Sequence, residues 1–149
     1  MTEPTGTRPP LVSHVSVGVT DLSRAGRFYD AVMGALGARR VMEHPFGIGY
    51  GRNFPEFWAS RPHDGKDAAP GNGTHVCFAA PDPETVVRFH QAGLAAGGFD
   101  DGAPGRRPHY APGYYAAFLR DPDGNKVEAL CWVAADTAVA SPHGPRTGS

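Results

Sequence analysis

The sequence predicts a mixed α+β fold built from two βαβββ modules. Two observations support this prediction. The chain resembles itself after a shift of 61 residues, with eight identities in the 25 positions from 14 to 38, which indicates a duplicated unit. Each copy also contains a short strand-forming run, then a capped amphipathic segment, then three short apolar runs bounded by Gly, Pro or Asn.

The first module is expected over residues 11–62, opening with a strand at 11–19. Asp21 then has the character of a helix cap, and Gly37 that of a helix end. Between them, apolar residues recur at three- and four-residue spacing: Leu22, Ala25, Phe28, Val32 and Leu36. Short runs at 40–44, 47–51 and 56–60 are the expected remaining strands, with Tyr50 and Phe57 in the core.

The second module is expected over residues 73–133. A strand at 74–80 precedes a helix that starts at Asp82-Pro83-Glu84 and ends at Gly97-Gly98. Strands are expected at 99–102, 114–119 and 126–133, whereas residues 103–113 are too rich in Pro for a strand and predict a loop.

The last two strands should form a hairpin around Asp121-Pro122-Asp123-Gly124-Asn125, a strong turn sequence. Alternation then places Glu128, Leu130 and Trp132 on one face of the sheet. A carboxylate in so apolar a strand must be solvated, paired with a cation or bound to a metal.

Composition narrows the possible functions. The chain has 149 residues, a mass of 15.7 kDa and a net charge of −1, without a basic run or an apolar stretch near 18 residues. Nucleic-acid and membrane partners are therefore not expected. The absence of a signal-peptide pattern and the two widely spaced cysteines predict a reduced, cytoplasmic protein. Residues 1–10 and 134–149 are expected to be disordered, because they are rich in Pro, Gly, Thr, Ser and Ala.

Four motifs together resemble the vicinal oxygen chelate superfamily, which includes glyoxalase I, extradiol dioxygenases and bleomycin resistance proteins. They are Val12-Ser13-His14-Val15, Asp21-Leu22 with Phe28-Tyr29, Gly73-Thr74-His75-Val76, and the run from Asp121 to Glu128. The resemblance covers residues 11–133 and implies a glyoxalase-like half-barrel, in which each module curls its strands into a cup. Exposed sheet edges in such a fold predict a homodimer.

The resemblance implies that His14, His75 and Glu128 bind one divalent transition metal, namely Fe, Mn, Ni, Co or Zn. Two imidazoles and a carboxylate suit these ions. A fourth ligand position falls on either Glu56 or Trp58. Trp58 is favoured to face the pocket, because Pro55 suggests that the strand has barely begun at Glu56. Glu128 or Glu56 is the expected base.

Several further residues are candidates for contact with a small-molecule substrate. Cys77 shares the strand face of His75 and could line the pocket, although the role of a small buried hydrophobe is favoured. Arg106, Arg107, His109, Tyr110, Tyr114 and Tyr115 form an aromatic and basic group before the last hairpin. This group either orients an anionic or phenolic substrate or packs as an ordinary surface loop.

Three functions remain open from the sequence. The first is a metal-dependent, glyoxalase-I-like lyase or isomerase acting on a small oxygen-chelating substrate, with a carboxylate moving the proton. The second is an Fe(II) ring-cleaving dioxygenase, which uses the same two-His-one-carboxylate set. The third is a non-enzymatic resistance protein that binds a drug or natural product. The sequence also leaves open whether the site lies within one chain or at a dimer interface.

Overall fold

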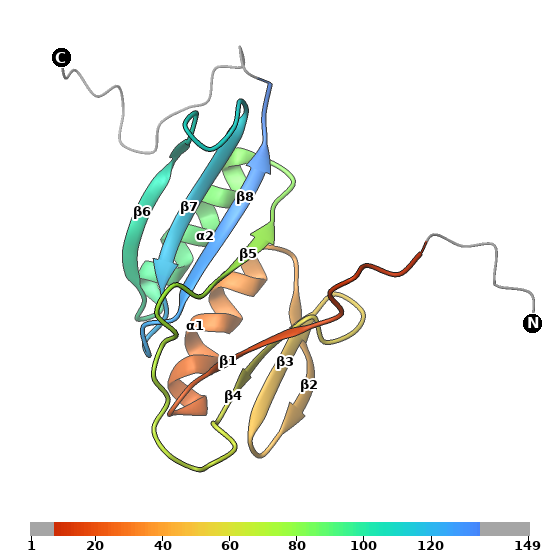
Figure 1. Ribbon diagram of the computed structural model, residues 1–149, viewed down its shortest axis with the longest axis vertical. Coiled ribbons are helices and arrows are strands. Elements are labelled where there is room, and N and C mark those ends of the chain that lie inside the picture. The colour runs from red at the N-terminus through yellow and green to blue at the C-terminus, as the bar shows by residue number, and fades with distance from the viewer. Residues whose placement is uncertain (1–7, 135–149) are drawn as a thin grey trace, which may run out of the picture.

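The computed structural model describes residues 8–134 and contains the predicted βαβββ order twice (Figure 1). The first module consists of β1 (Val15–Gly18), α1 (Leu22–Ala35), β2 (Arg39–His44), β3 (Gly47–Gly51) and β4 (Phe57–Ser60). The second consists of β5 (His75–Ala79), α2 (Pro83–Ala95), β6 (Phe99–Arg106), β7 (Tyr114–Arg120) and β8 (Lys126–Trp132). The fold class read from the sequence is therefore confirmed.

Each module forms its own four-stranded sheet, and the two sheets have equivalent topologies. The strand orders are β1-β4-β3-β2 and β5-β8-β7-β6. In both sheets the first and last strands of the module pair in parallel, and the other neighbours pair antiparallel. Among residues 8–134 no strand pair joins the two sheets, so β1 and β5 each keep one unpaired edge.

Both helices begin and end where the sequence predicts. The Asp21 side chain accepts a hydrogen bond from the Arg24 backbone N–H at 3.0 Å, and Asp82 accepts one from Thr85 at 2.8 Å. These bonds satisfy amide groups that have no partner inside the helix. Gly37 and Gly97, just beyond the last turns, have φ of 78° and 94°, a conformation that glycine adopts without strain.

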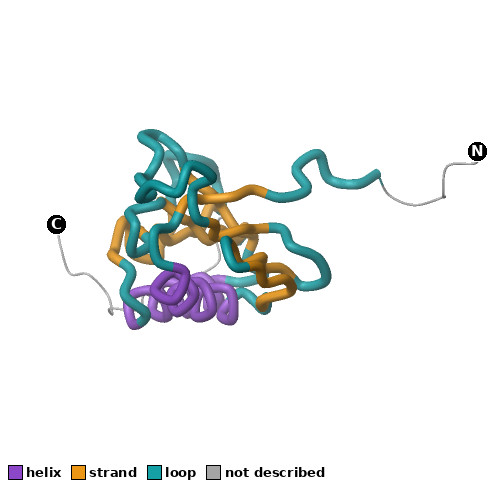
Figure 2. The backbone as a smooth tube through the Cα atoms, turned by 90° about the horizontal axis from the view of Figure 1, so that it is seen from below, coloured by secondary structure: helices purple, strands orange, loops and turns teal. Residues whose placement is uncertain are grey.

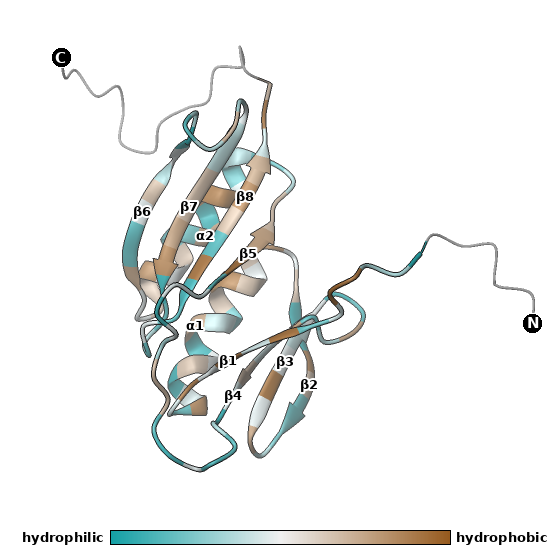
Figure 3. Ribbon diagram, in the orientation of Figure 1, coloured by the Kyte–Doolittle hydropathy of each residue, from teal (hydrophilic) through white to brown (hydrophobic). Residues whose placement is uncertain are grey.

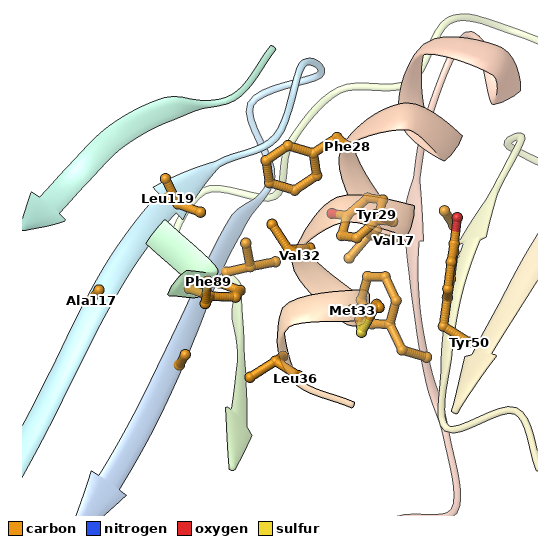
Figure 4. Packing of buried hydrophobic residues seen from close by; sticks show 14 of the residues in the cluster. Val17, Phe28, Tyr29, Val32, Met33, Leu36, Tyr50, Phe89, Ala117 and Leu119 are labelled. Carbon is orange, nitrogen blue, oxygen red and sulfur yellow. The ribbon is translucent and has the colours of Figure 1, made fainter. Parts of the chain in front are cut away.

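The core lies between the two helices and one face of each sheet. Figure 2 shows the helices as a layer on one side of the strands. Side chains from α1, α2 and the helix-facing sides of the strands meet in this layer, as Figure 4 shows for Phe28, Val32, Tyr50, Phe89 and Leu119. Tyr50 and Phe57 are 1% and 2% exposed, which confirms that they belong to the core.

The two modules meet at the helices, where the chain approaches itself closely. Helix α1 packs along α2, and a Cβ added at Gly93 would lie 3.1 Å from Val32 Cγ1 and 2.3 Å from Leu119 Cδ1. A larger residue at Gly93 would therefore force the helix away from its neighbours.

The turn between β7 and β8 also holds the modules together. Asp121 is fully buried and accepts hydrogen bonds from the Tyr29 hydroxyl at 2.7 Å and from Asn125 Nδ2 at 2.9 Å. Asn125 Nδ2 also donates to the Gly18 carbonyl oxygen at 2.8 Å. A turn recognised from local sequence thus fixes the second module against β1 and α1 of the first.

Two strand predictions were wrong at their ends. The predicted loop at 103–113 begins later, because β6 continues through Pro104 to Arg106. Its pairing with β7 shifts register twice, between Asp100 and Gly102 and between Gly102 and Gly105, and such irregularities accommodate a proline that cannot donate to the ladder. The hydrophilic character of β6 beside the more apolar β7 is visible in Figure 3.

The first strand is shorter than predicted, since it begins at Val15 rather than at residue 11. Its partner β4 starts only at Phe57, so residues 11–14 have no strand to pair with. Leu11 is consequently fully exposed. The expectation of disorder at 1–10 and 134–149 falls mostly outside residues 8–134. Within that range, neither helix combines the length and apolar character needed to cross a bilayer.

Candidate metal and substrate site

The face of the second sheet that points away from α2 carries most of the polar candidates. We call this surface the second inner face. Strand alternation places on it His75, Cys77, Tyr114, Phe118, Lys126 and Glu128. The intervening residues Val76, Ala117, Leu119, Val127 and Ala129 point into the core. The alternation predicted around Glu128 is therefore present.

Glu128 lies at the centre of this face and is 1% exposed. One carboxylate oxygen, Oε1, is 3.1 Å from His75 Nε2. The other, Oε2, accepts a short hydrogen bond from the Tyr114 hydroxyl. A buried carboxylate is tolerated only when its oxygens have such partners, so His75 and Tyr114 hold the acid in one orientation.

Tyr114 and Cys77 remain protonated beside this carboxylate. Desolvation and the hydrogen bond to Glu128 raise the pKa of Tyr114 above its usual range, so its hydroxyl acts as a donor. Cys77 is solvent-exposed as a residue, but its sulfur lies next to Glu128. Desolvation, followed by the negative charge of Glu128, raises the pKa of the Cys77 thiol to about 12. Cys77 therefore lines the face as a neutral thiol.

A cavity of about 430 Å³ opens above this part of the sheet. Its lining combines the Glu128 cluster with a loop before β5 and with two basic residues: Asn72, Gly73, Thr74, His75, Tyr110, Tyr114, Phe118, Arg120, Lys126 and Glu128. A volume of this size accommodates a small molecule. The cavity thus places one acid, one imidazole, two phenols and two cations around a common space.

Of the candidates at residues 106–115, Arg107, His109, Tyr110 and Tyr114 lie at the second inner face, whereas Arg106 is the register partner of Tyr115 and lies on the other side of the sheet. Rings follow one another from His109 to Tyr110 at 4.3 Å and from Tyr110 to Tyr114 at 5.2 Å between centroids. Arg107 lies over the Phe118 ring at 5.6 Å and donates to the Ala103 carbonyl oxygen at 2.7 Å. Tyr115 does not belong here. It is 2% exposed in the core, because alternation turns it to the opposite side from Tyr114.

The corresponding face of the first sheet has a different surface, which we call the first inner face. The Trp58 indole covers Gly49, where an added Cβ would lie 3.0 Å from Trp58 Cζ2. Trp58 stacks on His44 with 5.7 Å between centroids and 6° between planes, and His44 stacks on Phe46 at 5.2 Å and 14°. Three parallel rings thus replace the charged cluster of the second inner face.

Glu56 occupies a separate hollow. A cavity of about 290 Å³ between the modules is lined by Glu56, Arg52, Val12 and Ser13 together with Cys77 and other residues of β5. Glu128 does not line this cavity. The two carboxylates considered as bases therefore face different spaces within one chain.

The register of the two sheets shows which positions are equivalent. In the first sheet Ser16 pairs with Trp58, and in the second Cys77 pairs with Glu128. Ser16 and Cys77 are separated by the 61-residue repeat. Trp58 is therefore the structural counterpart of Glu128, and Glu56 is the counterpart of Lys126.

His14 is not brought to the Glu128 cluster within one chain. It is exposed and lies one residue before β1, at the repeat position equivalent to His75. Among residues 8–134 no three His, Cys, Asp or Glu side chains form a group that could hold a metal ion. One chain thus offers His75 and Glu128 together, with His14 apart from them.

Sequence reasoning missed Lys126, Phe118 and His44 as parts of these faces. Lys126 was detectable in principle, because it stands two residues before Glu128 and so shares its face. The His44–Trp58 stack joins residues of β2 and β4 across a glycine in β3, and no local pattern in the sequence specifies that contact.

Comparison with known proteins supports the fold and the family. A sequence profile for the Glyoxalase/Bleomycin resistance protein/Dioxygenase superfamily matches residues 11–129. A glyoxalase/bleomycin resistance protein from Albidiferax ferrireducens T118 is 41% identical with a TM-score of 0.74, over 81% of this chain and 98% of that chain. No curated protein matches the chain.

Two further solved structures share the fold at lower identity. A glyoxalase-related enzyme from Fulvimarina pelagi is 24% identical with a TM-score of 0.62, over 80% of this chain and 86% of that one. Lactoylglutathione lyase from Agrobacterium tumefaciens is 23% identical with a TM-score of 0.58, over 83% and 95%. At such identity the likeness extends to the fold alone.

Proposed function

The chain belongs to the glyoxalase/bleomycin resistance protein/dioxygenase superfamily, and on that premise we propose that it is a divalent-metal-dependent enzyme of the glyoxalase-like lyase or isomerase type. Its substrate in this proposal is a small molecule that chelates through oxygen. A cytoplasmic location and a homodimeric state belong to the same proposal. The observation that carries it is the buried Glu128 carboxylate, which lines a cavity while paired with His75 and Tyr114.

The donor chemistry of this pair fits a divalent transition metal, but one chain does not complete the site. An imidazole nitrogen and a carboxylate oxygen are ligands that such metals accept. His14 is the remaining candidate donor, and it is exposed at the edge of the first sheet. We therefore place His14 of a second copy beside His75 and Glu128, in a homodimer that buries the unpaired edges of β1 and β5.

A bound metal would polarise the substrate oxygens as a Lewis acid. The protein groups have separate tasks. Glu128 is the base in this proposal, since its carboxylate is oriented by two partners and faces the cavity. Tyr114 donates to Glu128 and so helps to hold the carboxylate in one orientation. Glu56 opens into the other cavity and takes no part in proton transfer within the same chain.

The position of Trp58 favours a second candidate, the Fe(II) ring-cleaving dioxygenase. Because Trp58 is the counterpart of Glu128, the set available to a metal is two histidines and one carboxylate, without a fourth side chain. That set leaves several coordination positions open and is typical of non-haem iron oxygenases. An assay with catecholic substrates under Fe(II) separates this candidate from the isomerase.

Metal binding by variant proteins tests the proposal. Purified protein should bind a divalent metal stoichiometrically, and both His14→Ala and His75→Ala should lower the affinity by about 10-fold or more, because each removes one of few ligands. Glu56→Gln is the matched control and should bind as the parent does. Wild-type affinity in His75→Ala would contradict the assignment, and binding of a hydrophobic drug without metal would favour the non-enzymatic alternative.

Mixing the two histidine variants tests where His14 acts. If the site is shared between copies, a refolded mixture of His14→Ala and His75→Ala contains heterodimers with one intact site, and part of the metal binding returns. If all ligands come from one chain, the mixture binds no better than either variant alone. Sedimentation of the same samples shows whether dimers are present.

A further inference from the structure

A basic cluster lines the cavity above Glu128, at the end of the second inner face nearest the Asp121–Asn125 turn. Arg120 Nε and Lys126 Nζ approach the same oxygen, Asp101 Oδ2, at 3.0 and 3.2 Å. Two cations therefore share one carboxylate, and the cluster retains a positive charge. The side chains are only 39%, 31% and 30% exposed for Arg120, Lys126 and Asp101, so water screens that charge incompletely.

Lys126 is the member of the cluster whose N–H donors can also bind a ligand. Arg120 is fixed at a second point, because its Nη1 donates to the Gly124 carbonyl oxygen at 3.0 Å. The Lys126 ammonium has three N–H donors, and Asp101 is the one acid that it contacts among residues 8–134. It also lies over the Phe118 ring, 4.9 Å from the centroid. The ammonium is thus held above an apolar floor inside the cavity.

The positive charge of Lys126 lies close to His75 and Glu128, the candidate reaction centre. Lys126 and Glu128 lie two residues apart on the same face of β8, a spacing of about 7 Å along a strand. Lys126 is also the register partner of His75 on the neighbouring strand. An anion bound by Lys126 would therefore lie beside the His75–Glu128 pair, in the same cavity.

We propose that Lys126 binds a carboxylate of the substrate, with Asp101, which also pairs with Arg120, holding the ammonium in place. The substrate is then an anionic small molecule with its carboxylate at Lys126 and its oxygen-chelating centre at His75 and Glu128. This inference rests on the proposed function for the placement of the chelating oxygens at His75 and Glu128.

A pair of probes that differ by one carboxylate tests the inference. Catechol and 3,4-dihydroxybenzoate both carry vicinal oxygens, and their binding to zinc-loaded protein can be followed by titration calorimetry at low salt. Wild-type protein should prefer 3,4-dihydroxybenzoate by about 10-fold, as expected for one charge-assisted hydrogen bond. Lys126→Met should remove the preference and leave catechol binding unchanged, whereas Lys126→Arg should keep most of it.

Lys66 provides the matched control, because the chain contains just two lysines. Lys66 lies exposed in the loop between β4 and β5, so Lys66→Met should bind both probes as the wild type does. Added salt should reduce the preference of the wild type for the anionic probe and leave catechol binding unaffected. Equal binding of the two probes by wild-type protein would overturn the inference.

A second measurement keeps the inference testable when neither probe binds, an outcome that would count against the proposed function instead. Reductive dimethylation with ¹³C formaldehyde labels both lysines and preserves their charge. Titration of the metal-free protein with benzoate should then move the Lys126 resonance and leave that of Lys66 in place. A Lys126 resonance that stays unmoved would refute the carboxylate site independently of any metal, and movement with inorganic phosphate alone would refute a carboxylate-specific role.

Discussion

The two inner faces differ far more than the two modules that carry them. The buried cores of the modules match closely, since Phe28 of α1 and Phe89 of α2 are related by the repeat and both are fully buried. On the opposite sides, the first sheet presents Trp58 stacked on His44, and the second presents Glu128 held by His75 and Tyr114. Packing constrains the buried side of both copies in the same way, whereas the open side is free to carry different chemistry.

The identities between the copies follow this division. Asp21 and Asp82 both cap helices, and Gly37 and Gly98 both follow them. On the inner faces the repeat retains just the histidine pair, His14 and His75. The comparison indicates that duplication supplied a scaffold and that the faces were specialised separately, one as an aromatic surface and one as a polar site.

The largest expected effect is on metal affinity, and it should differ between substitutions at the equivalent positions Glu128 and Trp58. We expect Glu128→Leu to lower the affinity for a divalent metal by roughly 10- to 100-fold, as loss of a ligand or its close partner does. Trp58→Leu should change that affinity by less than about twofold, because an indole is not among the ligands of such metals. Competition titration against a chelating dye measures both, and equal losses would erase the proposed difference between the faces.

A smaller effect, on stability, is expected from a substitution at Gly49, which the Trp58 indole covers on the first inner face. Gly49→Ala should reduce the free energy of unfolding by about 1–3 kcal/mol, since the new Cβ would lie 2.8 Å from Pro55 Cβ and 3.0 Å from Trp58 Cζ2. Urea denaturation followed by circular dichroism measures the change.

Gly34 provides the control for that substitution. It is exposed within α1, and an added Cβ would meet nothing within 4 Å. Gly34→Ala should therefore stabilise the protein by up to about 1 kcal/mol through helix propensity. If Gly49→Ala left the free energy of unfolding unchanged, the Trp58–His44 stack would be able to shift without destabilising the protein.

The smallest expected effect concerns the thiol beside Glu128. With a pKa of about 12, Cys77 should react slowly with iodoacetamide at pH 8 and about 10-fold faster for each pH unit, because only the thiolate attacks. Glu128→Gln removes a negative charge that opposes ionisation, so the pKa of Cys77 falls and its labelling becomes several-fold faster. Peptide mass spectrometry gives the rates, with the buried Cys131 as an internal reference. Rapid labelling of wild-type Cys77 at pH 7 would contradict the placement of its sulfur.

The sequence alone predicted the fold because its determinants are local or periodic. The repeat, the Asp caps, the glycine stops and the Asp121–Asn125 turn each act through neighbouring residues, and all appear in the structure. Alternation along β8 likewise separated Glu128 from Val127 and Ala129, which lie in the core. Errors arose where the outcome depended on a partner strand, as at residues 11–14, or on a tolerated irregularity, as at Pro104 in β6.

Only the tertiary structure decided which side chains meet. The equivalence of Trp58 with Glu128 follows from the register of parallel pairs between strands about 40 and 50 residues apart in sequence, a separation over which sequence patterns fix no contacts. The hydrogen bond from Tyr114 to Glu128, the sharing of Asp101 by Arg120 and Lys126, and the separation of His14 from Glu128 were settled in the same way. Each depends on how two sheets pack against one pair of helices, because burial and charge compensation are properties of the assembled layers rather than of any one strand.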